Sequence, residues 1–122
     1  MLETDEFWIF SQFHPLIFQT IADVQGTRLG GCMIARMPPN SEIPEHKDAG
    51  PCGFYYDRFH IVLKSKDVDF YCGDEVVQMK EGELWWFDQT LPHKVINKSD
   101  EDRIHLIMDI KTLRDGKWPT PN

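Results

Sequence analysis

The sequence predicts an all-β sandwich or barrel that carries one short helix near its N-terminus. Eight short segments rich in β-branched and aromatic residues are separated by turn signals, and they do not alternate with helical segments as β-α units would. Of the 122 residues, 41% are hydrophobic, with eight glycines and eight prolines, which is typical of a globular protein with many turns. No repeat, linker or low-complexity tract interrupts the chain, so we expect a single domain over residues 1–122.

The helix is predicted at residues 15–24. Its apolar positions recur at helical spacing, namely Leu16, Ile17, Ile21 and Val24. Pro15 is acceptable in a first helical turn, and Gly26 follows at a plausible stop. The segment is amphipathic, so we expect it to cover part of a sheet.

The strands follow the helix. The candidates are residues 32–37, a short extended piece around Ile43, and residues 55–63, 68–72, 75–79, 83–87, 93–97 and 103–110. Pro38, Pro39 and Asn40 end the first of them. Gly73 and Asp74 separate two strands by a two-residue turn signal, which predicts a β-hairpin.

Two of these strands combine an apolar face with a face that carries cations. Side chains alternate along a strand, so Arg58 shares a face with His60, and Arg103 shares a face with His105. The opposite faces are apolar, and the helix can cover them. Cations that point into a small barrel are costly unless an anion meets them, which favours a bound dicarboxylate such as 2-oxoglutarate.

His46, Asp48 and His93 are the candidate metal ligands. They form an H-x-D pair followed by a distal histidine. Two histidines and a carboxylate can bind non-haem Fe(II) on one face of the ion and leave its other coordination positions open. Each motif alone also fits an exposed loop or turn. The H-x-D pair, however, ends an extended piece and precedes the glycine-rich residues 48–53, as expected for a metal at a barrel mouth.

Arg103 has two interpretations from the sequence. It could form a surface ion pair with Glu101 or Asp102, which would contribute little stability. Alternatively, its guanidinium could grip a carboxylate with two hydrogen bonds, which lysine does less well.

Charge and composition argue against several classes of partner. The net charge of −7 disfavours nucleic acid and anionic membranes, because phosphate binding relies on clustered lysine and arginine. No apolar run reaches membrane-spanning length, and the acidic start does not resemble a signal peptide. The three cysteines form no C-x-x-C pair, so we expect reduced thiols and a cytoplasmic location.

Several motifs together resemble the aspartyl/asparaginyl β-hydroxylase-like oxygenases. The resemblance extends over about residues 30–111 and is carried by residues 35–40, 43–48, 58–63, 82–88, 93–97 and Arg103. It implies a double-stranded β-helix (a jelly-roll or cupin-like barrel), with Fe(II), 2-oxoglutarate as cosubstrate, O₂, and hydroxylation of an unactivated C–H bond.

The resemblance also implies residue roles. His46 and His93 match the iron-binding histidines, and Asp48 matches the carboxylate ligand present in some branches of the family. Arg103 matches the arginine that holds the distal carboxylate of 2-oxoglutarate, at the same spacing from the second histidine.

Arg58 and His60 match residues that face the carboxylates of cosubstrate or substrate, and the sequence leaves open which of the two each serves. Two positions depart from the peptide-hydroxylating branch: Ala35 replaces a serine that assists at the distal carboxylate, and Tyr56 replaces a substrate-binding arginine. These departures argue against the same peptide aspartates as substrate.

The function expected from the sequence is a dioxygenase that hydroxylates an amino acid or a peptide residue and releases succinate and CO₂. One alternative is a cupin-type metal enzyme that acts on a small carboxylic acid without 2-oxoglutarate. The other is a non-catalytic, cupin-like binding module. The sequence does not indicate an oligomeric state.

Overall fold

The computed structural model describes residues 14–47 and 56–113, and all structural statements refer to them. They form one helix and eight strands: α2 (His14–Asp23), β1 (Gly26–Met37), β2 (Ser41–His46), β3 (Asp57–Lys64), β4 (Val68–Cys72), β5 (Glu75–Val77), β6 (Leu84–Trp86), β7 (His93–Asn97) and β8 (Arg103–Thr112). The all-β prediction with one N-terminal helix is therefore confirmed. No helix within this part of the chain is long and apolar enough to cross a membrane.

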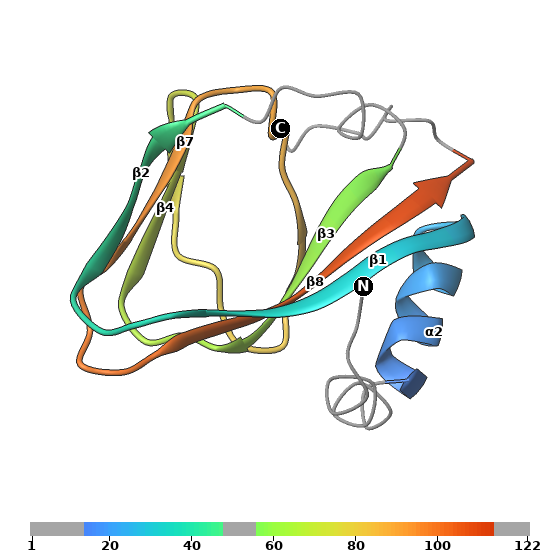
Figure 1. The fold of residues 1–122 in the computed structure, drawn as a ribbon, viewed down its shortest axis with the longest axis horizontal. Helices are drawn as coiled ribbons and strands as arrows, with labels where there is room; N and C mark the ends of the chain where they lie inside the picture. The colour runs from blue at the N-terminus through green and yellow to red at the C-terminus, as the bar shows by residue number, and fades with distance from the viewer. Residues whose placement is uncertain (1–13, 48–55, 114–122) are drawn as a thin grey trace.

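The strands form two antiparallel four-stranded sheets. One sheet has the order β1-β8-β3-β6 and the other the order β2-β7-β4-β5. β1 runs along the first sheet and continues through a turn into β2 of the second sheet, so the chain joins the two layers (Figure 1). Helix α2 lies on the outer side of the first sheet (Figure 1).

The first sheet separates two cores. Its outer face packs on α2 through Ile17, Phe59, Leu106 and other apolar residues. Between the sheets, Val62 packs with Val95 and further apolar residues of the second sheet. The predicted alternation along β3 and β8 is thus confirmed, and the cation-bearing face points between the sheets.

Most predicted elements match closely. The hairpin is formed by β4 and β5, with Gly73 at the positive φ of 58° that a tight turn favours. The strand predicted at residues 55–63 runs over Asp57–Lys64, and its first predicted residue lies outside the described part of the chain. The strand predicted at residues 75–79 ends earlier, at Val77.

β1 is the main difference, because it begins at Gly26 and not at residue 32. Its early half pairs with the end of β8, with irregular register next to Arg28 and Gly31. Gly30 lies against the ring of Tyr56: a Cβ atom placed there would come 2.5 Å from the ring. The absence of a side chain at Gly30 therefore allows the ring of Tyr56 to approach this strand closely.

Candidate metal and carboxylate site

The two histidines predicted to bind metal come together at one end of the barrel. His46 ends β2 and His93 begins β7, and the two residues are paired across the second sheet. Their ring centroids are 4.3 Å apart, with the ring planes tilted by 58°. The register of the two strands is irregular between Ile43 and His46, and irregularities of this kind are common next to functional sites.

Backbone carbonyls orient both rings in the same way. Nδ1 of His46 lies 2.9 Å from the carbonyl oxygen of Pro44, and Nδ1 of His93 lies 2.8 Å from that of Leu91. A neutral imidazole that donates from Nδ1 carries its lone pair on Nε2, which is the tautomer that a metal requires. The chain thus prepares two neighbouring imidazoles for one cation.

Aromatic side chains fix the position of His93, which is only 4% exposed. The ring of Phe70 is parallel to it, with centroids 6.5 Å apart, and Phe87 meets it edge-on at 5.2 Å. These contacts restrict the imidazole and reduce the access of water on its inner side.

Asp48, the predicted third ligand, lies outside the described residues, so its role stays a prediction. Among the residues that are described, no group of three His, Cys, Asp or Glu side chains is placed to hold a metal. Lys47 is the last described residue before it. An ion held only by His46 and His93 would therefore need a further ligand.

Arg103 points into the barrel. It is the first residue of β8 and is 5% exposed. Its Nε atom is buried without a hydrogen-bond partner in the described part of the chain, and burial lowers its pKa to about 10. The alternative of a surface ion pair with Glu101 or Asp102 is wrong, because Arg103 is buried, and Asp102 pairs with Arg36 at 2.8 Å.

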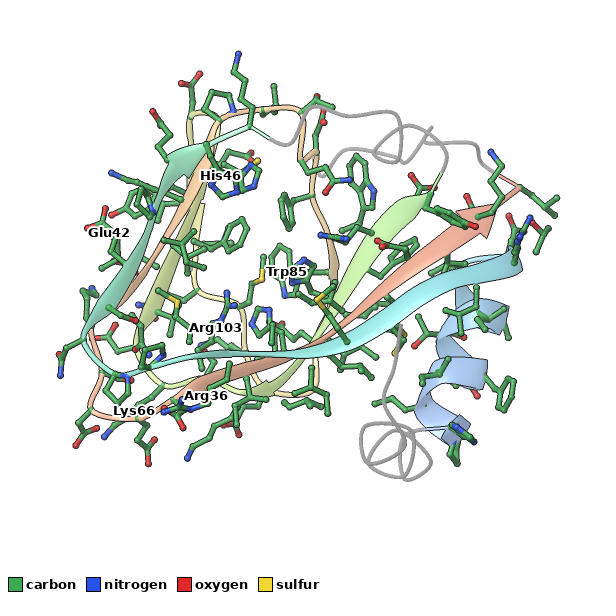
Figure 2. The ribbon with its side chains drawn as sticks, in the orientation of Figure 1. Arg36, Glu42, His46, Lys66, Trp85 and Arg103 are labelled. Carbon is green, nitrogen blue, oxygen red and sulfur yellow. The ribbon has the colours of Figure 1, made fainter. Side chains whose placement is uncertain are left out.

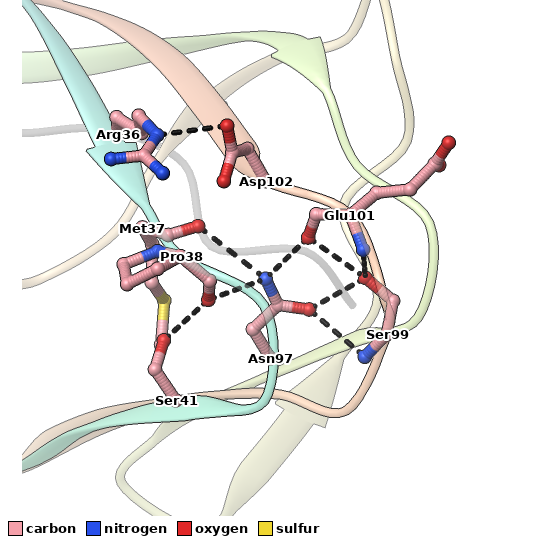
Figure 3. Close-up of polar contacts among 8 residues, drawn as sticks. All are labelled: Arg36, Met37, Pro38, Ser41, Asn97, Ser99, Glu101 and Asp102. Atoms are coloured by element: carbon pink, nitrogen blue, oxygen red, sulfur yellow. Dashed lines mark hydrogen bonds and ion pairs between the residues drawn. The ribbon is translucent and has the colours of Figure 1, made fainter.

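The turn that precedes Arg103 is held by the side chain of Asn97, at the end of β7. Its Nδ2 donates to the carbonyl oxygens of Pro38 (3.1 Å) and Glu101 (2.9 Å). Its Oδ1 accepts from the backbone nitrogen and the hydroxyl of Ser99, at 3.0 and 2.8 Å (Figure 3). Asn97 therefore ties the β1–β2 turn to the β7–β8 turn and fixes where β8 starts.

His60 and His105 form a buried pair between the metal-binding histidines and Arg103. Their Nδ1 atoms are 3.0 Å apart, and Nε2 of His60 is buried without a partner among the described residues. Burial, together with the charge of Arg103, lowers the pKa of His60 to about 3 and that of His105 to about 2. Both rings are neutral near pH 7.

Arg58 differs from Arg103 because the chain itself neutralises it. Its Nε and one terminal nitrogen donate to the two oxygens of Asp109 at 2.8 and 3.0 Å. The expectation that a bound anion meets the inward-facing arginines therefore does not apply to Arg58, and for Arg103 it stays a prediction. Asp109 was missed, although it continues the alternation from Arg103 through His105; the sequence could have indicated it.

The site residues form one row between the sheets. Figure 2 shows His46 near the end of β2, Arg103 toward the opposite end, and Trp85 between them. Phe87 links the two histidine pairs, with centroids 5.2 Å from both His60 and His93. The paired imidazoles at one end suit a divalent cation. The buried arginine at the other end, which has no counter-ion among residues 14–47 and 56–113, suits a carboxylate.

A cavity of about 200 Å³ adjoins this row. Its walls include four aromatic rings and two carboxylates, from Phe70, Trp85, Trp86, Phe87, Glu75 and Asp88. Phe70 and Phe87 also contact His93, so the cavity lies next to the paired histidines. We refer to it below as the aromatic cavity.

The fold is that of the cupin class, the double-stranded β-helix. A cupin domain from Bordetella pertussis superimposes with a TM-score of 0.52 at 19% identity, over 70% of this chain and 85% of that one. Salicylate 1,2-dioxygenase from Pseudaminobacter salicylatoxidans gives a TM-score of 0.53 at 18% identity, over 75% of this chain and 28% of that one. At such identities the similarity shows the fold alone.

The sequence identifies the family within this class. The profile of the family described as Aspartyl/Asparaginyl beta-hydroxylase matches residues 10–112, so this chain belongs to that family. L-proline cis-4-hydroxylase from Rhizobium meliloti is 32% identical over 82 residues. That match covers 64% of this chain but only 28% of the relative, so this chain spans less than a third of that enzyme.

Proposed function

We propose that this protein is an Fe(II)- and 2-oxoglutarate-dependent dioxygenase that hydroxylates an unactivated C–H bond and releases succinate and CO₂. The observation that carries the proposal is the combination, within one barrel, of two adjoining imidazoles and a buried arginine that has no counter-ion among the described residues. Family membership supports the same conclusion.

When bound, iron and 2-oxoglutarate together supply the oxidising power that activates O₂ toward the substrate. The protein supplies the ligands, the orientation and the exclusion of water. His46 and His93 would hold the ion through Nε2. Asp48 would be the third ligand, and its carboxylate would add a negative charge.

Arg103 would hold the distal carboxylate of 2-oxoglutarate. The guanidinium is already desolvated, and the hydrogen bonds of the β7–β8 turn hold the backbone next to Arg103, which reduces the ordering needed on binding. A carboxylate there would also remove the energetic cost of a buried, uncompensated charge.

The substrate we favour is an amino acid or a peptide residue. The aromatic cavity adjoins His93 and can take an apolar portion, while Glu75 and Asp88 at its wall suit a cationic nitrogen. The hydroxylation of proline by the curated relative supports a small amino-acid substrate. Arg58, paired with Asp109, remains a candidate for carboxylate recognition only if a ligand competes with that aspartate.

The test is a thermal-shift titration of the purified chain with Mn(II) or anaerobic Fe(II), with and without 2-oxoglutarate. Joint stabilisation beyond the sum of the separate effects is expected, because each ligand improves the site for the other. Asp48→Ala should weaken the metal effect, whereas Asp100→Ala, which removes an exposed partner of Lys66, should not.

Succinate formation separates the alternatives. A cupin-type enzyme that acts on a small acid without 2-oxoglutarate would bind metal but release no succinate. A binding module would show neither joint stabilisation nor succinate, and that result would refute the proposed function.

A further inference from the structure

The contact between His60 and His105 poses a question of proton placement. Two Nδ1 atoms at 3.0 Å can share a hydrogen bond only if one ring donates and the other accepts. Both rings are neutral near pH 7, so each carries a single N–H. The direction of this one bond therefore decides which nitrogen of His60 carries the proton.

The two directions give opposite chemistry at Nε2 of His60. If His60 donates from Nδ1, its Nε2 bears a lone pair and repels an anion. If His105 donates, Nε2 of His60 bears the proton and becomes a hydrogen-bond donor. Nε2 is buried and has no partner among the described residues. The position of the proton therefore decides whether Nε2 donates a hydrogen bond to a ligand or accepts one.

Arg103 indicates the direction. Arg103 and His105 line the same narrow gap, and His105 in turn contacts His60. The charge of Arg103 lowers the pKa of both rings, as expected for a neighbouring cation. An arginine without a counter-ion in the described chain calls for an anion, and an anion favours a neighbour that donates to it.

We propose that His105 is a positioning residue: it donates Nδ1–H to Nδ1 of His60, so that Nε2–H of His60 becomes a second donor, beside Arg103, for a ligand carboxylate. The inference rests on the proposed function in that the carboxylate belongs to 2-oxoglutarate or to the substrate. His105 itself need not touch the ligand.

The surroundings of His105 suit this role. The ring is 1% exposed, so water does not compete for its Nδ1–H. The residue is paired with Ala35 on one side and Val62 on the other, and neither side chain offers a hydrogen bond. His60 is therefore the partner that fixes the orientation of the His105 ring.

The direct test is the tautomer of His60 in the metal-free protein, read by ¹⁵N NMR of ¹⁵N-histidine-labelled chain. The resonances of His60 are assigned by their loss in His60→Phe. We expect the Nε2–H tautomer in the parent. His105→Phe, which keeps the ring shape but removes the donor, should shift His60 toward the Nδ1–H form.

Ligand affinity gives the second readout, with 2-oxoglutarate titrated in the presence of Mn(II). His105→Phe should raise the Kd roughly ten-fold or more, the effect of one lost charge-assisted hydrogen bond. His105→Asn, whose amide can donate near the Nδ1 position, should recover most of this loss. Ile17→Ala, buried on the far side of the sheet, should lower stability without changing the Kd.

A parent protein with His60 in the Nδ1–H form would overturn the inference, even if His105→Phe failed to fold. An unchanged tautomer and Kd in a folded His105→Phe would do the same. By contrast, a parent with the expected tautomer that does not respond to 2-oxoglutarate would refute the proposed function and leave the role of His105 in setting the tautomer intact.

Discussion

Arg103 carries a charge for which the described part of the chain provides no counter-ion. Desolvation alone lowers its pKa, whereas Arg58 on the neighbouring strand is met by Asp109. A protein that retains a buried charge of this kind gives up stability in the absence of a ligand. At the scale of single residues, the site is thus marked by an energetic cost that a bound acid would remove.

Replacing Arg103 by methionine separates this cost from its function. We expect Arg103→Met to stabilise the ligand-free protein by about 1–3 kcal/mol, because an apolar side chain of similar length replaces a desolvated charge. The same variant should lose 2-oxoglutarate binding by a factor of roughly 100 or more. Chemical denaturation and ligand titration measure the two effects.

Arg36→Met is the matched control, since Arg36 is exposed and pairs with Asp102 at the surface. It should change stability by less than about 1 kcal/mol and leave ligand binding unaltered. A destabilised ligand-free Arg103→Met would contradict the view that this charge is uncompensated.

At the scale of elements, the turn between β7 and β8 links the two ends of the site. His93 begins β7 and Arg103 begins β8, so the ten-residue spacing seen in the sequence spans a strand and one turn. Strand patterns predicted β7 with its observed bounds and the start of β8. They could not predict the role of Asn97, because its partners lie in two turns that meet only in the folded barrel.

Asn97→Ala should therefore destabilise the protein by about 2–4 kcal/mol, since it removes several hydrogen bonds and leaves buried backbone groups unpaired. It should also raise the Kd for 2-oxoglutarate, because Arg103 loses its fixed starting point. Lys66→Ala, which removes an exposed ion pair with Asp100 across the same end of the barrel, should cost less than about 1 kcal/mol. Equal effects of the two changes would argue against a special role for Asn97.

Helix α2 stabilises the barrel from outside. Ile17 is 5% exposed and packs on the first sheet, whereas its neighbour Phe18 is 67% exposed. We expect Ile17→Ala to cost about 2–4 kcal/mol of unfolding free energy and Phe18→Ala less than 1 kcal/mol. Neither change should affect metal or 2-oxoglutarate binding in a protein that remains folded, which thermal-shift titration of both variants can establish.

At the scale of the whole molecule, one sheet serves two purposes. Its outer face binds the helix, and its inner face carries the polar row from His60 to Arg103. Alternation along the strands was sufficient to predict this division. Alternation also places Asp109 on the inner face, but it does not show that Asp109 pairs with Arg58 or that His105 pairs with His60. Those two contacts depend on the register between β3 and β8.

The inner face makes the stability of the whole fold sensitive to acid. The pKa values of His60 and His105 are lowered from 6.5 to about 3 and about 2. Below pH 6.5 the unfolded chain takes up protons at these positions while the folded chain does not. Their contribution to stability is therefore full above pH 6.5 and is lost as the pH falls toward 3.

Denaturant titrations of the metal-free protein between pH 7 and 5 test this dependence. Each histidine contributes a slope of at most about 1.4 kcal/mol per pH unit. The carboxylates with lowered pKa values, such as Asp69 and Asp100, change the stability only below about pH 4, which is outside the pH range of these titrations. His105→Phe should make the curve shallower by the contribution of one group, while Phe18→Ala should run parallel to the parent. If the curves of His105→Phe and the parent were also parallel, burial would not keep His105 neutral. The argument that one proton lies between the two imidazoles would then fail.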